Sequence, residues 1–132
     1  MKASESSRGK FIITSTANGQ YFFVLQDIGN HKTVLSASES YVTKDDAWNG
    51  IEAVRSSSVL PERYHRYSSV VGDPYFELVS GHSKVIGQCA MYGSMQAREH
   101  GIAWVMANAK NAPVEDQSRS SKVDAVLRSY RR

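Results

Sequence analysis

An internal repeat constrains the fold of this chain more than any other feature of its 132 residues. The segment Tyr21–Leu25 aligns with Pro74–Leu78 at an offset of 53 residues, and Gly50 aligns with Gly101 at an offset of 51. The two-residue difference falls in an expected hairpin turn, where an added residue costs little because the backbone is solvated. We therefore interpret the chain as two tandem copies of one structural unit.

Each copy is predicted to contain three β-strands followed by one α-helix. Alternating apolar and polar residues and many aromatic and β-branched side chains indicate the strands. The strands are expected at 10–15, 20–26 and 33–38 in the first copy, and at 64–70, 75–79 and 84–90 in the second. Thr43 and Ser94 each precede an apolar stripe of helical period, so we predict that they are helix N-caps.

The repeat predicts an α+β fold formed by internal duplication of a β-β-β-α unit. A three-stranded sheet with one helix leaves much apolar surface open, and a second copy can cover it. We therefore expect two antiparallel three-stranded sheets and two helices that share one core. A single domain is expected over residues 1–118, from repeats at about 9–58 and 62–112, followed by a basic C-terminal tail at 119–132.

A glycine occupies the same position in the middle of both predicted helices. Gly50 and Gly101 each cost up to about 1 kcal/mol there relative to alanine, so a common cause is expected. Tyr41 and Tyr92 also repeat, just before the helices. We interpret all four as structural repeat positions, where the helix backbone approaches the sheet or the other helix closely. The functional alternative is a ligand that lies against bare backbone.

Short motifs recur in the same order in both copies. In the first copy they are Gly9-Lys10-Phe11, Tyr21-x-Phe23-x-Leu25, Ser40-Tyr41 and Asn49-Gly50-Ile51-Glu52-x-Val54. In the second copy they are Glu62-Arg63-Tyr64, Tyr75-Phe76-x-Leu78, Val85-Ile86-Gly87, Met91-Tyr92 and Gly101-Ile102-Ala103-x-Val105. Over about residues 9–118 the chain resembles the YegP-like family of uncharacterised bacterial proteins. The resemblance implies the duplicated β-β-β-α unit, and it implies no established activity or catalytic residue. Pro74 stands where this family usually has an aromatic residue.

Signatures of catalysis and of metal binding are not found in the sequence. It has no nucleophile elbow, no phosphate-binding glycine loop and no His-Glu-x-x-His motif. The four histidines lack a second ligand at i+2 or i+4. Cys89 is interpreted as a small buried residue of its strand. We therefore predict no catalytic residue, no metal site and no cofactor, and we do not expect an enzyme.

The predicted sheet of the first copy has an apolar outer face. If Phe11 and Phe23 point inward, then Ile12, Phe22 and Val24 point to the opposite face. Their counterparts in the second copy are His65, Tyr75 and Glu77. Because an exposed apolar cluster usually marks a contact surface, the three apolar residues are candidate binding residues. The alternative is that they are covered within the domain.

Positive charge is concentrated at the C-terminal end. Residues 117–132 contain five basic and one acidic residue, whereas the other 116 residues contain 11 basic and 12 acidic residues. Arg128, Arg131 and Arg132 are therefore candidate contacts to an acidic partner such as nucleic acid. Apolar residues between 123 and 130 have the spacing of a short amphipathic helix. A disordered end is the alternative.

Three classes of function follow from these features. The leading hypothesis is a non-catalytic interaction module that binds a partner protein or itself through the outer face of the first copy. The second is a nucleic-acid-associated protein that uses the basic tail, and the least supported is a small-molecule enzyme with its site between the copies. No apolar run is long enough to cross a bilayer and the first residues do not form a secretory signal. We therefore expect a cytoplasmic location and no membrane partner.

Overall fold

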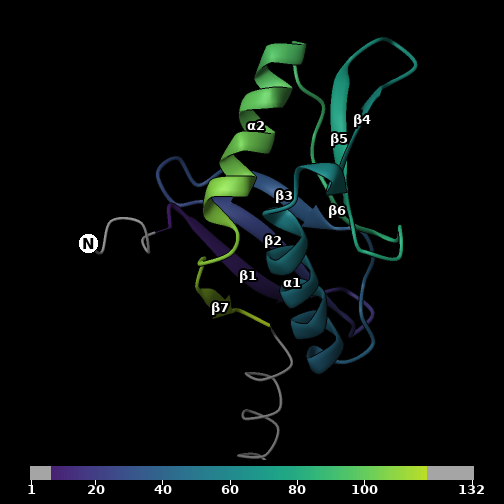
Figure 1. Cartoon of the computed structure of the whole chain (residues 1–132). Helices are drawn as coiled ribbons and strands as arrows, with labels where there is room; N and C mark the ends of the chain where they lie inside the picture. The colour runs from purple at the N-terminus through teal and green to yellow at the C-terminus, as the bar shows by residue number, and fades with distance from the viewer. Residues whose placement is uncertain (1–6, 119–132) are drawn as a thin grey trace, which may run out of the picture.

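The computed structural model describes residues 7–118 and shows two helices packed on one face of a β-sheet (Figure 1). The strands are β1 (Gly9–Ser15), β2 (Tyr21–Asp27), β3 (Thr33–Ala37), β4 (Tyr64–Ser68), β5 (Pro74–Val79), β6 (Val85–Gln88) and β7 (Val114–Asp116). The helices are α1 (Lys44–Ser58) and α2 (Met95–Asn108), and a short 3-10 helix covers Pro61–Arg63. The predicted α+β class is confirmed.

All seven strands belong to one mixed sheet with the order β4-β5-β6-β3-β2-β1-β7. The prediction of two separate three-stranded sheets is wrong, because β3 and β6 pair antiparallel, with Ser36 opposite Gln88 and Ala37 opposite Gly87. If the two sheets had stayed apart, both strands would be open edges with unpaired backbone groups. Their pairing satisfies these groups and joins the two copies at the centre of the sheet.

The strand β7 extends the sheet beyond the predicted end of the second copy near residue 112. It runs parallel to β1, and the Phe11 N–H donates a hydrogen bond of 2.8 Å to the Pro113 carbonyl at its start. Two ion pairs of 2.8 Å fasten its side chains, Lys10 to Glu115 and Lys44 to Asp116. Three residues are too few for a periodic signal, and these pairing partners lie far away in the sequence, so the sequence pattern did not predict this strand.

Both helices begin where the sequence predicted. The Thr43 hydroxyl accepts a hydrogen bond of 3.0 Å from the Asp46 N–H. The Ser94 hydroxyl accepts an equivalent bond of 3.0 Å from the Ala97 N–H. Each cap satisfies one of the free N–H groups of the first helical turn, so both N-cap predictions are confirmed.

The helices and the sheet enclose one core cluster with side chains from both copies. α1 contacts β2 of its own copy and β5 and β6 of the other, whereas α2 contacts β5 and β3. Among the large side chains that are fully buried are Phe11, Ile13, Phe23, Leu25, Leu35, Ile51, Val54, Phe76, Leu78 and Val105. Each helix thus packs on strands of the other copy as well as its own.

Two strands of the second copy are shorter than predicted, because β4 ends at Ser68 and β6 ends at Gln88. Cys89 follows the last residue of β6. Its thiol accepts a hydrogen bond from the Phe76 N–H and donates one to the Phe76 carbonyl, both 3.3 Å long. The thiol thus replaces a missing backbone partner of β5. Burial raises the pKa of the Cys89 thiol, which keeps the proton that this donation needs. Within residues 7–118 no helix is long and apolar enough to span a bilayer.

Candidate binding cleft between the two repeats

A cavity of about 490 Å³ opens between α1 of the first copy and the β5–β6 hairpin of the second. The loop between β3 and α1 forms one wall, which contains Glu39 and Tyr41. The part of α1 between Asp46 and Ala53 forms another wall. Ile86 on β6 lines its apolar part, and Lys84 lies in the hairpin. We call this cavity the Tyr41 cleft. Because both copies contribute to it, the cleft exists only when the two copies are joined.

Tyr41 is held rigidly in the wall of the cleft. Its backbone forms two hydrogen bonds with Tyr21, of 2.7 and 2.8 Å. Its ring stacks on Phe23, with a centroid distance of 6.1 Å and an interplanar angle of 14°. Burial raises the pKa of the Tyr41 hydroxyl, and the nearby carboxylates Glu39 and Asp46 raise it further against the opposing charge of Lys84. The hydroxyl therefore stays protonated at neutral pH.

Gly50 is required at its position because the Tyr41 ring lies over it. A Cβ atom at position 50 would be 2.5 Å from Tyr41 Oη and 2.9 Å from Phe23 Cε2. Both distances are shorter than van der Waals contact, so a side chain at this position would displace the rings. The close approach to the helix thus comes from an aromatic side chain of the same copy, and the glycine backbone forms part of the cleft wall.

Charged groups surround the mouth of the cleft. Lys84 Nζ lies 2.9 Å from Glu39 Oε2, so this ion pair bridges the second copy to the first. The Lys84 and Glu39 side chains remain 65% and 45% exposed, and an ion pair this open is weak. Asp46 adds a second carboxylate on the first turns of α1. The lining therefore contains two acidic groups and one basic group.

The second copy repeats the tyrosine and glycine scaffold. Tyr92 stacks on Phe76 with a centroid distance of 6.3 Å and an angle of 16°, and a Cβ atom at Gly101 would lie 2.6 Å from Tyr92 Cζ. The Tyr92 N–H donates to the Pro74 carbonyl at 2.8 Å. Because proline has no N–H, the second bond of the Tyr21 and Tyr41 pair has no equivalent here.

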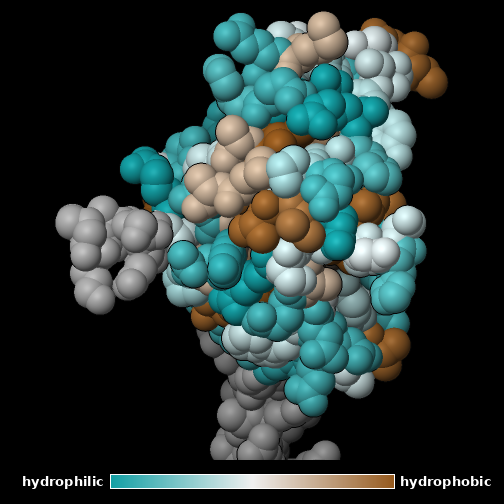
Figure 2. Space-filling view, in the orientation of Figure 1, coloured by the Kyte–Doolittle hydropathy of each residue, from teal (hydrophilic) through white to brown (hydrophobic). Residues whose placement is uncertain are grey.

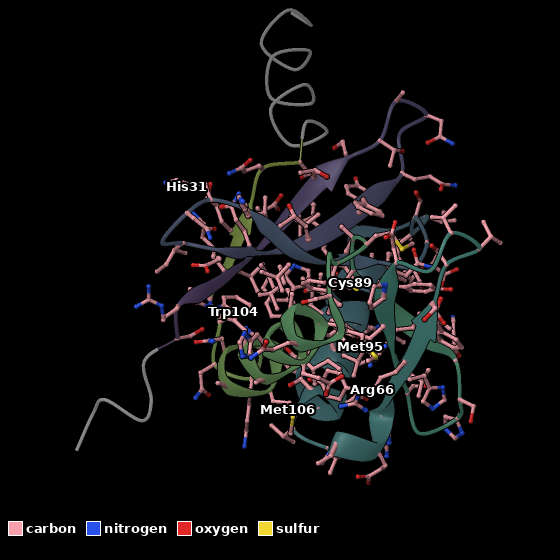
Figure 3. All side chains as sticks on the ribbon, turned by 90° about the horizontal axis from the view of Figure 1, so that it is seen from above. His31, Arg66, Cys89, Met95, Trp104 and Met106 are labelled. Atoms are coloured by element: carbon pink, nitrogen blue, oxygen red, sulfur yellow. The ribbon has the colours of Figure 1, made fainter. Side chains whose placement is uncertain are left out.

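The second copy differs from the first where the cleft would be. The counterpart of Ala53, which lines the Tyr41 cleft, is Trp104. The indole reaches from α2 toward the beginning of β1 (Figure 3), and a Cβ atom at Gly9 would lie 2.9 Å from Trp104 Cη2. The counterparts of Glu39 and Asp46 are two alanines, at positions 90 and 97. The second copy thus has a bulky indole and two alanines where the first has Ala53 and two carboxylates.

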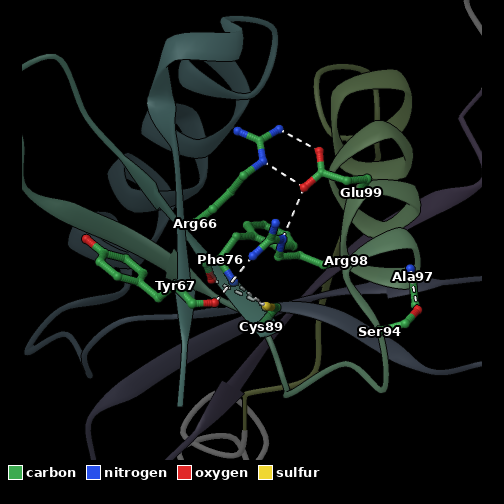
Figure 4. A network of polar contacts seen from close by, with 8 residues as sticks. All are labelled: Arg66, Tyr67, Phe76, Cys89, Ser94, Ala97, Arg98 and Glu99. Atoms are coloured by element: carbon green, nitrogen blue, oxygen red, sulfur yellow. Dashed lines mark hydrogen bonds and ion pairs between the residues drawn. The ribbon is translucent and has the colours of Figure 1, made fainter. Parts of the chain in front are cut away.

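A polar network ties β4 to α2 in the second copy (Figure 4). Arg66 donates from Nε and Nη2 to the Glu99 carboxylate at 2.7 and 2.8 Å. Arg98 donates to Glu99 at 3.1 Å and to the Tyr67 carbonyl at 3.4 Å. The hydrogen bond from Arg66 is the largest cause of the lowered pKa of Glu99. These residues pair with one another, so we assign them to holding the β4–β5 hairpin against the helix.

The three candidate binding residues on the outer face of the first copy do not form an open patch. Ile12 is only 7% exposed. Phe22 and Val24 are half-buried, and Phe22 packs against the core cluster. A contact surface at these residues stays a prediction. Apolar atoms are more prominent elsewhere, for example at the tip of the β4–β5 hairpin, where Val70 and Val71 are exposed (upper right in Figure 2).

The other predicted sites are placed only in part. Arg128, Arg131 and Arg132 lie outside the described residues. Between residues 7 and 118 no three His, Cys, Asp or Glu side chains come together in a group that could hold a metal ion. His31 lies in the β2–β3 hairpin and adopts a left-handed backbone conformation with φ of 61°.

Sequence reasoning singled out Tyr41 and Gly50 of the cleft lining but missed its charged residues. Glu39, Asp46 and Lys84 lie in three different segments, and no local motif connects them. A signal was nevertheless present in the repeat, because the two copies differ in chemistry at cleft positions, for example Ala53 against Trp104 and Glu39 against Ala90. Comparing the copies for differences, in addition to matches, would have pointed to Ala53 and Trp104.

Comparisons with known proteins agree with the repeat. A family model described as a domain of unknown function, DUF1508, matches residues 17–64 and 70–116. The UPF0339 protein YegP of Escherichia coli K12 is 39% identical over 110 residues, which are 83% of this chain and 98% of YegP. A UPF0339 protein of Bordetella pertussis is 38% identical over 112 residues, which are 85% of this chain and 98% of that protein.

Two solution NMR structures share the fold. The structure of YegP from E. coli, a protein of unknown function, has a TM-score of 0.78 and 37% identity, and the match covers 86% of this chain and 96% of that chain. A UPF0339 protein of Shewanella oneidensis has a TM-score of 0.78 and 35% identity, with 85% and 93% covered. The fold and the doubled family match define a tandem-repeat α+β protein. The chain belongs to the YegP-like family of UPF0339 proteins, which its sequence motifs had implied.

Proposed function

We propose that this protein is a non-catalytic binding protein and that its ligand site is the Tyr41 cleft. The observation that supports this most directly is the difference between the copies at one pair of positions. Both copies keep the tyrosine stacked over a helix glycine. The first copy has Ala53 in the cleft lining, whereas the second has Trp104 at this position. A scaffold that is kept twice, with a small residue in one copy and a bulky indole in the other, is consistent with one binding site per chain.

The chemistry of the cleft favours binding over catalysis. The raised pKa of Tyr41 makes its hydroxyl a poor base or nucleophile at neutral pH. Glu39 and Lys84 are paired with each other at 2.9 Å. A cavity of about 490 Å³ lies within the range of small-molecule sites, which is roughly 300 to 1,000 Å³. Polar side chains line it together with apolar ones such as Ile86 and Ala53, and ligand pockets combine both kinds of group.

Filling the cleft tests this proposal. Ala53→Trp copies the residue of the second repeat into the first, so it should block the cleft while the fold persists. Compounds from a metabolite library that raise the melting temperature of the unmodified protein, or that appear in ligand-observed NMR, should lose their effect in this variant. Ala103→Trp is the matched control, because Ala103 is exposed on α2. Saturable binding that is unchanged in Ala53→Trp, or a library without any binder, would contradict the proposal.

The nucleic-acid hypothesis stays a prediction for the tail. The described residues contain ten basic and eleven acidic side chains, so they offer no net positive charge for a phosphate backbone. Contacts to nucleic acid would therefore fall to residues 119–132. Retention on heparin by the full chain, and its loss in a chain that ends at residue 118, would support this second function.

A further inference from the structure

The balance of charge in the Tyr41 cleft indicates which ligands it accepts. Lys84 is the cation of the lining, and its ammonium group is already paired with Glu39. Lys44 lies near the same helix end, but its ammonium group is 2.8 Å from Asp116, on the β7 side of the molecule. The Asp46 carboxylate forms no ion pair with any described residue. The charged side chains of the lining therefore sum to −1, although Asp46 lies in the first turn of α1, where the helix dipole offsets part of its charge.

Uncharged polar side chains also line the cleft, at Ser40, Tyr41, Asn49 and Ser80, and the Tyr41 hydroxyl can accept a hydrogen bond. The Tyr41 hydroxyl forms no hydrogen bond with a described side chain or backbone group, and the Phe23 stack holds it in place. A protonated hydroxyl offers its lone pairs as well as its hydrogen. A ligand with N–H donors can therefore bind Tyr41 and a carboxylate together. An anionic ligand would meet Asp46 and would have to compete with Glu39 for Lys84.

The floor of the cleft is apolar and closely packed. Ile86 is 5% exposed, and Ala53 packs against the core cluster. Gly50 also lines the cleft, although it is buried and the Tyr41 ring covers the position of its missing side chain. Such a surface suits a short hydrocarbon body, which gains free energy by leaving water.

We infer that the Tyr41 cleft binds a small organic cation, an amine or guanidinium carried on a short apolar chain. The positive group lies between Asp46 and Glu39 and donates to the Tyr41 hydroxyl, and the chain lies on Ile86 and Ala53. Lys84 then acts as an internal competitor, since it occupies Glu39 when no ligand is bound. This inference rests on the proposed function and adds the chemical class of the ligand.

Three probes with the same carbon chain separate charge from hydrophobic contact. n-Butylammonium, butyrate and n-butanol are titrated separately into the ¹⁵N-labelled full chain at low salt, and the amide resonances of Asn49, Gly50 and Lys84 are followed. Butylammonium should shift these resonances saturably, and the other two probes should bind at least about fivefold more weakly. Equal or tighter binding of butyrate or butanol at these amides would overturn the inference about charge, while the cleft would stand as a binding site.

Variants of the full chain assign the effect to particular groups. Asp46→Asn should weaken butylammonium binding about fivefold. Asp45→Asn is the matched control, because it removes the same charge from the same helical turn and does not line the cleft. Lys84→Gln should strengthen binding, because it frees Glu39. Equal effects of the two aspartate variants, or no gain from Lys84→Gln, would show that the cleft does not select a cation.

If none of the three probes shifts these amides, the cation inference is wrong. The library comparison with Ala53→Trp then decides separately whether the cleft binds a ligand of another class, so failure of the inference and failure of the proposed function remain distinguishable.

Discussion

Replacing each helix glycine by alanine tests whether the stacked tyrosines impose glycine on both helices. Gly50→Ala and Gly101→Ala are the same chemical change at the same repeat position, inside two helices of similar length. In an unconstrained helix each change should stabilise the protein by up to about 1 kcal/mol, because alanine has the higher helix propensity. The structure predicts the opposite sign for Gly50.

The predicted magnitudes come from what each new methyl group would meet. At position 50 it would lie 2.5 Å from Tyr41 Oη and 2.9 Å from Cε2 of Phe23, which is fully buried. Overpacking of this kind costs about 1 to 3 kcal/mol, so the net loss for Gly50→Ala should be up to about 2 kcal/mol. At Gly101 the three nearest atoms all belong to Tyr92, which is half-buried. One ring can move there, so the loss should be smaller.

Urea denaturation of single and double variants separates the two contributions. In a Tyr92→Ala background the clash at Gly101 disappears, so Gly101→Ala should become stabilising by up to about 1 kcal/mol. In a Tyr41→Ala background the contact with Phe23 remains, so Gly50→Ala should recover only part of its loss.

Two results would refute this reasoning. The first is a Gly50→Ala variant that is as stable as the unmodified protein. The second is an equal recovery of stability in both double variants. Among the three nearest contacts of each glycine, a second, buried ring lies only beside position 50, so the recovery there should be incomplete.

Four further predictions can be checked on the same protein. Burial raises the pKa of Tyr92 from 10.0 to about 12, so the unfolded chain releases this proton first. The free energy of unfolding, measured by urea denaturation, should therefore fall as the pH rises from about 10 to about 12, and it should fall less steeply in Tyr92→Phe. His31→Gly should stabilise the protein by about 0.5 to 1 kcal/mol in thermal denaturation, because φ of 61° is unfavourable for histidine; no gain would mean that the side chain contributes. A chain of residues 1–58 should aggregate or self-associate in light scattering, because it exposes the β3 edge and half of the core, and a stable monomer would contradict a shared core. If the outer face is a contact surface, the double variant Phe22→Ser and Val24→Ser should keep the melting temperature and lower partner binding. A large drop in the melting temperature of a monomeric protein would instead assign both side chains to the core.

Features that depend on neighbouring residues were predicted from the sequence. Thr43 and Ser94 cap their helices as predicted, because a cap involves a hydroxyl and an N–H only three residues apart. Phe11 and Phe23 are fully buried, in agreement with the inward direction considered for them, because alternate residues of a strand point to one face. The family was recognised for a related reason, since its short motifs recur in order.

Features that depend on free strand edges were not predicted. The β-β-β-α pattern is the same whether two sheets stay apart or join, and the choice follows from the unpaired edges of β3 and β6 once both copies are folded. β7 is similar, because its place beside β1 follows from an open edge and from the ion pairs of Lys10 and Lys44.

The candidate site illustrates the same division. The sequence alone determined that Tyr41 and Gly50 have partners at Tyr92 and Gly101, because equal spacing in two copies can be read directly. It did not determine that a tyrosine ring covers each glycine, or that a cleft opens beside Ala53. Cavities depend on the sizes of side chains brought together from distant segments, and here Lys84 and Ile86 come from the other copy. Only the tertiary structure decided that the joined copies leave this space open, because close packing is a property of the assembled core and has no period along the chain.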